Sequence, residues 1–102
     1  MKINTQSLHF SADKKLVDLI DKRLSKLEQY FDRIIEANVT LKLENSGQIK
    51  DKITEVRLAI PGTVLCAKEK NKSFEAGLDS VTNALKRQLI RYKDQARSRS
   101  SR

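Results

Sequence analysis

The strongest constraint on the fold is a regular apolar spacing in residues 73–93, SFEAGLDSVTNALKRQLIRYK. Large apolar side chains recur there every three or four residues, as on one face of an amphipathic helix. They are Phe74, Leu78, Val81, Leu85, Leu89 and Tyr92. Ser73 can cap this helix through its hydroxyl, whereas Gly77 weakens the first turn by roughly 1 kcal/mol relative to Ala. The segment predicts a helix with an apolar face toward a core and Arg87 and Arg91 on the opposite side.

A second helical pattern runs from Ala12 to about Ile34, and Ser11 can cap it. Its buried face is predicted to consist of Leu16, Ile20, Leu24, Leu27, Phe31 and Ile34, with Val17 beside it.

Charges on this first helix are sorted by sign. The acidic residues Asp18, Asp21, Glu28 and Asp32 fall on one side, and the basic residues Lys15, Lys22, Lys26 and Arg33 form a row on another. Arg23 lies between the basic row and the apolar face. When charged residues serve only to solvate a helix, positive and negative side chains are more often mixed, so that they form i,i+4 pairs. The sorting therefore favours a basic binding row.

Alternation of apolar and polar residues predicts the strands. Residues 37–44 alternate with Ala37, Val39, Leu41 and Leu43 inward, and residues 53–60 with Thr54, Val56, Leu58 and Ile60 inward. Residues 63–69 predict another strand, and residues 2–8 a first strand at a sheet edge. The polar segments 45–51, with Gly47, and 68–72 are predicted to be connections, and Pro61-Gly62 a turn.

The predicted order is β-α-β-β-β-α in one domain with one modest core. It indicates an α+β, two-layer sandwich in which a four-stranded sheet carries both helices on one face. The first strand is expected beside the second and parallel to it, through a right-handed crossover. Basic residues of the two helices would then share one surface.

The net charge of +8 is concentrated at one end of the chain. Residues 86–102 hold seven basic residues and one acidic residue, whereas residues 1–85 hold fourteen and twelve. This concentration favours an anionic partner over a merely solvated surface. Residues 96–102 have almost no apolar content and are predicted to be a flexible basic tail, which leaves residues 1–95 as the folded domain.

Other features argue against several classes of function. Cys66 is predicted to be a small buried hydrophobe, and as the single cysteine it forms no internal disulfide. His9 is the single histidine, so no metal or other cofactor is expected. No catalytic triad or phosphate-binding glycine loop is evident, so the chain is not expected to be an enzyme. A signal peptide and a membrane-spanning run are not evident either, and a cytoplasmic location is expected.

Specific motifs lie on both predicted helices. The second carries Leu78-Asp79, Leu85, Arg87-Gln88-Leu89, Arg91 and Lys93, and the first carries Arg23-Leu24, Lys26-Leu27-Glu28 and Tyr30-Phe31. Together with the ANVTLKLE strand and the Pro-Gly turn, they resemble the short-form ribosome hibernation promoting factors, a family that includes the ribosome-associated inhibitor of translation. The resemblance covers residues 1–95. The basic tail is more similar to the short promoting factors than to the inhibitor, whose extension is acidic.

The resemblance implies that the chain binds rRNA in the decoding region of the small ribosomal subunit, where it blocks mRNA and tRNA. It implies RNA contacts at Arg23, Lys26, Arg87 and Arg91. Further basic residues expected to contribute are Lys15, Lys22, Arg33, Lys86 and Lys93. Binding is expected to rest on backbone charge and shape, because the five aromatic residues fall mostly on core positions. No small-molecule substrate or membrane partner is expected, and the free protein is expected to be a monomer.

Three positions depart from the family pattern. Ala84 replaces a common lysine, Lys86 replaces a common acidic residue, and Glu75 replaces a common aromatic residue. The alternative interpretation is a generic double-stranded-RNA-binding or protein-adaptor module with a similar α+β fold. The resemblance also leaves open whether the chain promotes ribosome dimers or silences single ribosomes.

Overall fold

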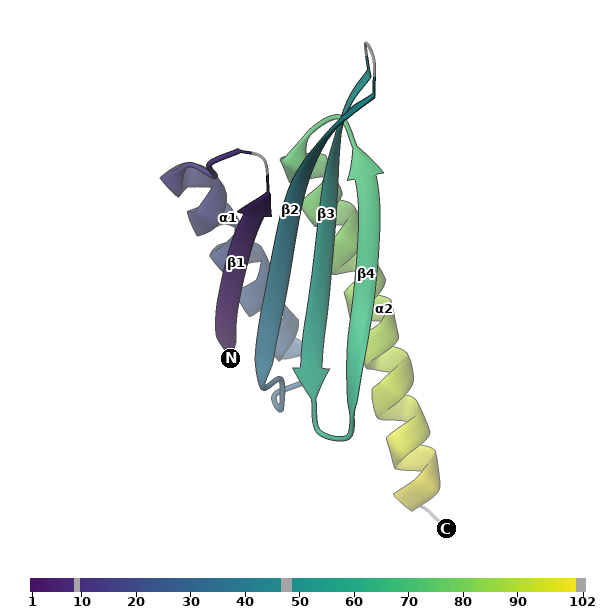
Figure 1. Ribbon diagram of the computed structural model, residues 1–102. Helices are drawn as coiled ribbons and strands as arrows, with labels where there is room; N and C mark the ends of the chain where they lie inside the picture. The colour runs from purple at the N-terminus through teal and green to yellow at the C-terminus, as the bar shows by residue number, and fades with distance from the viewer. Residues whose placement is uncertain (9, 47–48, 101–102) are drawn as a thin grey trace.

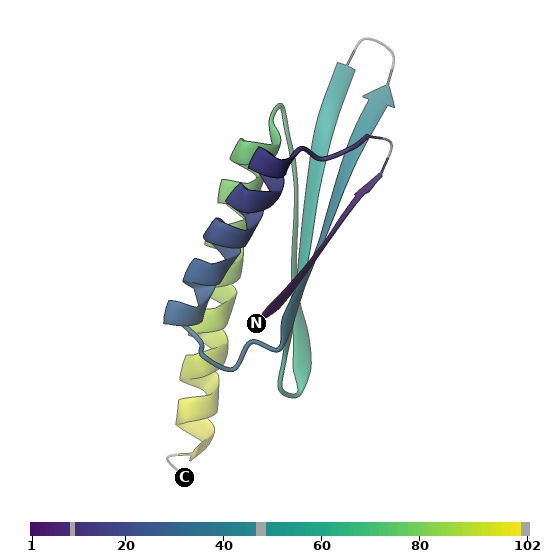
Figure 2. The same ribbon diagram turned by 90° about the vertical axis from the view of Figure 1, so that its left-hand side faces the viewer.

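The computed structural model describes residues 1–8, 10–46 and 49–100. The elements follow the predicted order, with one short 3-10 helix added. The strands are β1 (Lys2–Leu8), β2 (Glu36–Ser46), β3 (Ile49–Ile60) and β4 (Thr63–Asn71). The helices are α1 (Lys14–Ser25), the 3-10 helix η1 (Lys26–Gln29) and α2 (Phe74–Ser100). Both long helices cover the same face of the sheet (Figures 1 and 2), which confirms the α+β two-layer prediction.

The sheet has the strand order β1-β2-β3-β4. β1 lies at one edge and runs parallel to β2, with Lys2 beside Glu36, as the crossover argument predicts. β2, β3 and β4 form an antiparallel meander. The turn between β3 and β4 is at Pro61-Gly62, where Gly62 has a φ of 89°, a conformation that glycine adopts without strain. Among the described residues, helices cover one face of this sheet and leave the other face open.

The core lies between the sheet and the helix pair. Most of the predicted inward positions of β2 and β3 and of the apolar faces of α1 and α2 are buried, whereas Leu16, Phe31, Leu43 and Tyr92 are half-buried. The fully buried large side chains are Ile20, Leu24, Val39, Leu41, Thr54, Val56, Leu58, Leu78, Val81, Leu85 and Leu89. Burial of these side chains is the main force that holds both helices on the sheet.

The first helix is shorter than the sequence pattern predicts. Asp13, not Ser11, caps it, because the Asp13 carboxylate accepts the N–H of Leu16 at 2.8 Å. α1 ends at Ser25 rather than near Ile34, and the chain tightens into η1. The carbonyl oxygen of Leu27 then accepts the N–H groups of both Tyr30 and Phe31, at 3.0 and 3.3 Å. Packing of the residues after η1 against α2 therefore overrides a helical spacing that continues in the sequence.

The polar segments predicted as connections are partly strand. β2 extends to Ser46, β3 begins at Ile49, and β4 continues to Asn71, so the predictions for residues 45–51 and 68–72 are wrong. Ion pairs of Lys70 help to explain why these polar residues form strands. Its ammonium group lies 3.7 Å from the Glu44 carboxylate and 3.8 Å from that of Asp51. Opposite charges across neighbouring strands favour strand pairing in a stretch that is mostly polar. Gly47 lies outside the described residues, as does His9.

The prediction for Cys66 is also wrong, because its side chain is exposed. Leu65 and Ala67 face the helices, and alternation therefore places Cys66 on the open face of the sheet. α2 continues past the predicted end at Lys93 to Ser100, so the backbone of residues 96–100 is helical, where a flexible tail is predicted. None of the helices in the described residues has the length and apolarity that a membrane span needs.

Candidate nucleic-acid interface

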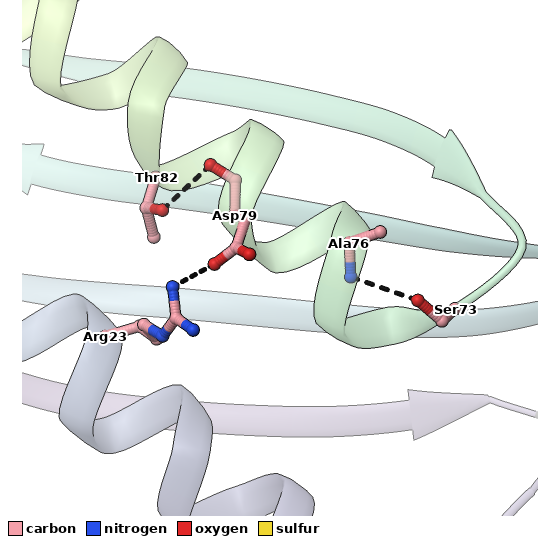
Figure 3. Close-up of polar contacts among 5 residues, drawn as sticks. All are labelled: Arg23, Ser73, Ala76, Asp79 and Thr82. Carbon is pink, nitrogen blue, oxygen red and sulfur yellow. Dashed lines mark hydrogen bonds and ion pairs between the residues drawn. The ribbon is translucent and has the colours of Figure 1, made fainter.

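α1 and α2 lie side by side on the sheet, and an ion pair joins them. The guanidinium of Arg23 on α1 donates to the carboxylate of Asp79 on α2 (Figure 3). The two side chains are 40% and 47% exposed, so the pair lies at the outer surface of the helix layer rather than in the core. Arginine has five N–H donors, which leaves Arg23 able to hold a phosphate while it contacts Asp79.

A second contact at the same seam holds Lys86. Its ammonium group lies 4.8 Å from the centre of the Tyr30 ring, in the segment that follows η1. This cation–π contact fixes the lysine beside α1 and leaves it half-buried. Ala84, another departure from the family pattern on α2, packs half-buried against the core and contributes no charge.

The predicted basic residues are placed on different parts of the helix layer. Those with exposed side chains are Lys15, Lys22, Lys26, Arg33, Arg87, Arg91 and Lys93, and Arg23 and Lys86 are half-buried. Lys22 and Lys26 lie on the same side of the first helical segment as Arg23, toward α2. On α2, Lys86 and Lys93 follow Asp79 at steps of seven residues, about two turns each, and so lie toward α1.

Three of the predicted residues lie apart from this group. Lys15 is in the first turn of α1, about two turns before Lys22. Arg33 is not in the helical row, because it follows η1 in the connection to β2. Arg91 is on the outer side of α2 but is turned toward β4. Its near neighbour on the helix is Gln88, whose amide nitrogen donates to the Cys66 carbonyl of β4 at 3.0 Å. Lys22, Arg23, Lys26, Lys86 and Lys93 border the seam, and Arg87 lies next to it on the outer side of α2. We call these six residues the helix-pair surface.

Contacts at both ends of α2 fix this surface relative to the sheet. At the N-terminus, the Ser73 hydroxyl accepts the N–H of Ala76 at 3.1 Å, which confirms the predicted cap (Figure 3). Further along, the hydroxyl of Tyr92 donates to the carbonyl oxygen of Pro61 at 3.0 Å. The Tyr92 ring also packs edge-on against Phe31, with ring centres 5.9 Å apart. α2 therefore presents its basic side chains from a rigid support.

The five aromatic rings are all engaged within the protein. Phe10 stacks on Phe74 at 4.9 Å, Phe31 packs on Tyr92, and Tyr30 lies under Lys86. The surface thus offers charge and hydrogen-bond donors and no free ring on which a base would stack. Within the described residues no group of three or more histidine, cysteine or acidic side chains is placed to hold a metal ion.

Comparison with known proteins identifies the family. The model of the family described as "Sigma 54 modulation protein / S30EA ribosomal protein" matches residues 3–97. The chain belongs to this family. The match spans all the elements that form the fold, so the resemblance inferred from the helix motifs is confirmed.

Curated members of the S30EA family are similar over nearly the whole chain. The ribosome hibernation promoting factor of Klebsiella oxytoca is 31% identical over 94 residues, which cover 92% of this chain and 95% of that protein. The Escherichia coli K12 protein of the same name is 30% identical, with the same coverage. The Pseudomonas putida KT2440 protein is 29% identical over 98 residues, 96% of this chain and 92% of that protein.

Solved structures show that the S30EA fold is shared. A ribosomal subunit interface protein from Coxiella burnetii has a TM-score of 0.83 at 20% identity, and covers 92% of this chain and 99% of its own. The N-terminal domain of Thermus thermophilus Protein Y has a TM-score of 0.79 at 24% identity, with 90% and 99% coverage.

The sequence did not reveal which residues hold the basic side chains of Arg23 and Lys86 in place. In the sequence, Asp79 and Tyr30 were each explained as part of a family motif. Their contacts with Arg23 and Lys86 join segments that are 56 residues apart in both cases. No short-range pattern in the sequence marks such pairs.

Proposed function

We propose that this chain silences translation by binding rRNA in the decoding region of the small ribosomal subunit and excluding mRNA and tRNA. The observation that supports this most is the helix-pair surface, where basic side chains from two segments distant in sequence lie on one rigid layer. Membership of a family whose curated members are named ribosome hibernation promoting factors supplies the ribosome as the partner.

Binding in this proposal is electrostatic and depends on shape. Each lysine or arginine placed against an rRNA phosphate releases a condensed counterion, so affinity falls steeply with salt. Recognition does not require base stacking, because every aromatic ring is already packed within the protein. The mechanism is occlusion, in which the folded domain fills the groove that mRNA and the tRNA anticodon ends would occupy.

The RNA-contacting residues in this proposal are those carried over from the family, Arg23, Lys26, Arg87 and Arg91. Lys22, Lys86 and Lys93 extend the contact along the seam, and Lys15 and Arg33 lie at its periphery. The sequence adds the basic residues Arg97, Arg99 and Arg102 at the end of the chain, and α2 projects past the turn between β3 and β4 in Figure 1.

The test is co-sedimentation of the purified protein with small ribosomal subunits at increasing salt, followed by competition with a short mRNA and initiator tRNA. We expect saturable binding to the small subunit, a steep loss of affinity with salt, and displacement of mRNA. A protein that binds an isolated RNA duplex as tightly as it binds the subunit would instead be a generic double-stranded-RNA-binding module. Binding that leaves mRNA in place would contradict occlusion.

A further inference from the structure

The outer edge of β1 presents free backbone groups. The N–H of Lys2 donates to the carbonyl oxygen of Ile35 at 3.3 Å, so the backbone of Lys2 points toward β2. Successive residues of a strand direct their backbone polar groups to opposite sides. The N–H and C=O groups of Ile3, Thr5 and Ser7 therefore point away from the sheet. Within the residues that the structure describes, no hydrogen bond reaches them outside the β1–β2 ladder.

A groove runs beside these groups, between β1 and α1. It has a volume of about 440 Å³, and the side chains of Ile3, Thr5 and Ser7 form its strand side. Val17 and Asp21 form its helix side. The same three strand residues thus line the groove and present the open backbone. Hydroxyl groups and a carboxylate make the groove polar, which suits an extended peptide better than the apolar face of a helix.

The flank of α1 that borders this groove is acidic. Asp21 lines the groove, and the Glu28 carboxylate lies 3.8 Å from the amino group of Met1, next to the start of β1. Asp18 lies one turn from Asp21 on the same flank and is exposed. One lysine, Lys14, shares this flank. The tertiary structure therefore divides the charges of the first helical segment, with acids toward β1 and Lys22, Arg23 and Lys26 toward α2.

The two sheet edges differ in how they are covered. Along β4, Gln88 of α2 donates to the Cys66 carbonyl, and α2 lies beside that edge in Figure 1. Along β1, the neighbouring helix leaves the groove open, and Figure 2 shows β1 as the outermost strand on that side. An open edge with regular backbone groups is a template for one more strand.

We infer that the β1 edge is a docking site for an extended peptide rich in lysine and arginine, which adds to the sheet as a fifth strand. Backbone hydrogen bonds to Ile3, Thr5 and Ser7 fix the register of the peptide against β1, as in other cases of strand addition. The acidic flank of α1 selects a basic peptide by charge complementarity. This surface is separate from the helix-pair surface, so the protein can hold RNA phosphates on one side and a basic protein segment on the other.

The experiment uses the full chain labelled with ¹⁵N and a blocked nine-residue peptide of alternating lysine and threonine. We expect the peptide to shift the amide resonances of Ile3, Thr5 and Ser7 and to slow their hydrogen exchange. A glutamate–threonine peptide of the same length should not bind. A lysine–threonine peptide with N-methyl groups on alternate residues should lose binding, because it cannot complete the ladder.

Matched variants separate strand addition from simple attraction. Asp18→Asn with Asp21→Asn should weaken peptide binding about three- to tenfold, whereas Glu69→Gln with Asp94→Asn, which removes as much charge elsewhere, should not. Thr5→Pro should abolish binding and keep the fold, since its N–H lies outside the β1–β2 ladder.

Several outcomes would overturn the inference. Equal binding of the N-methylated peptide would mean that only charge attraction operates. Peptide-induced shifts on the helix-pair surface or the open sheet face would place the site elsewhere. Concentration-dependent protection of the β1 amides without peptide would mean that a second copy of the chain is the occupant.

Discussion

Gly77 of α2 lies against Thr54 of β3 so closely that a Cβ atom at position 77 would be 2.6 Å from Oγ1 of Thr54. The same atom would be 3.3 Å from Cβ of Thr54 and 3.4 Å from Oδ1 of Asn71. Thr54 is fully buried and cannot move aside into solvent. In the sequence this glycine only weakens a helical turn, but in the structure it allows α2 to approach the sheet.

Replacing Gly77 with alanine should therefore destabilise the protein, although alanine is the better helix former. The gain in helix propensity is roughly 1 kcal/mol, and forced overpacking typically costs about 1–3 kcal/mol, so the contact should dominate or at least cancel the gain. Chemical denaturation would measure the free energy of unfolding. Asn83→Ala, at an exposed site on the same helix, is the control and should be neutral or stabilising.

The origin of the Gly77 effect can be tested by a second change. Thr54→Ala removes the Oγ1 atom that the new methyl group would meet. We expect the Gly77→Ala, Thr54→Ala double variant to lose less stability than the sum of the two single changes. Simple additivity would mean that the close approach is relieved by backbone movement instead.

Changing Arg87 and Arg91 to glutamine should weaken binding to the small subunit and leave the fold intact. Both side chains are exposed, and exposed substitutions usually change stability by less than about 0.5 kcal/mol each. The measurements are a thermal melt and a titration of translation inhibition in a cell-free system. The control, Lys42→Gln with Lys68→Gln, removes the same charge from exposed positions on the open face of the sheet and should retain inhibition.

Leu85→Ala should show the opposite pattern. Leu85 is fully buried, so its truncation should reduce the free energy of unfolding by roughly 2–5 kcal/mol. Inhibition should then be lost only in parallel with unfolding as temperature rises. Full inhibition by the double glutamine variant, with Leu85→Ala behaving as described, would show that the arginines only solvate the surface.

The Arg23–Asp79 pair should affect RNA binding more than stability. Exposed ion pairs contribute about 0–1 kcal/mol, so Arg23→Gln, Asp79→Asn and the double variant should all unfold nearly as the parent does. Affinity for the small subunit should fall in Arg23→Gln and rise in Asp79→Asn, which removes a negative charge beside an arginine proposed to contact phosphate. A fall in both single variants would mean that Asp79 is needed to position Arg23.

Tyr92→Phe should lower stability through the loss of one hydrogen bond. The hydroxyl of Tyr92 holds the Pro61 carbonyl at 3.0 Å, and such a bond contributes about 0.5–1.5 kcal/mol. Tyr30→Phe is the matched control, because it keeps the ring under Lys86 and no hydrogen bond of the Tyr30 hydroxyl is seen among the described residues. An equal loss in both variants would indicate a general effect of removing a surface hydroxyl.

The sequence by itself determined the features that depend on neighbouring residues. The three- and four-residue spacing of α2, the alternation in β2 and β3, the Ser73 cap and the Pro61-Gly62 turn are local patterns. From them the element order, the parallel placement of β1 and most core residues follow, because the periods of helix and strand fix which side chains share a face. The positions of the basic residues were also evident, because the sequence states residue identity directly.

Only the tertiary structure decided how those elements meet. The end of α1 at Ser25 depends on packing against α2, and the strand character of the polar residues near Lys70 depends on acids from other strands. The pairing of Asp79 with Arg23 follows only from the side-by-side placement of the two helices. The same placement decides which side of α1 faces β1 and which side faces α2. These relationships join residues far apart in the chain, and their energies arise from contacts that exist only after the sheet and helices have packed.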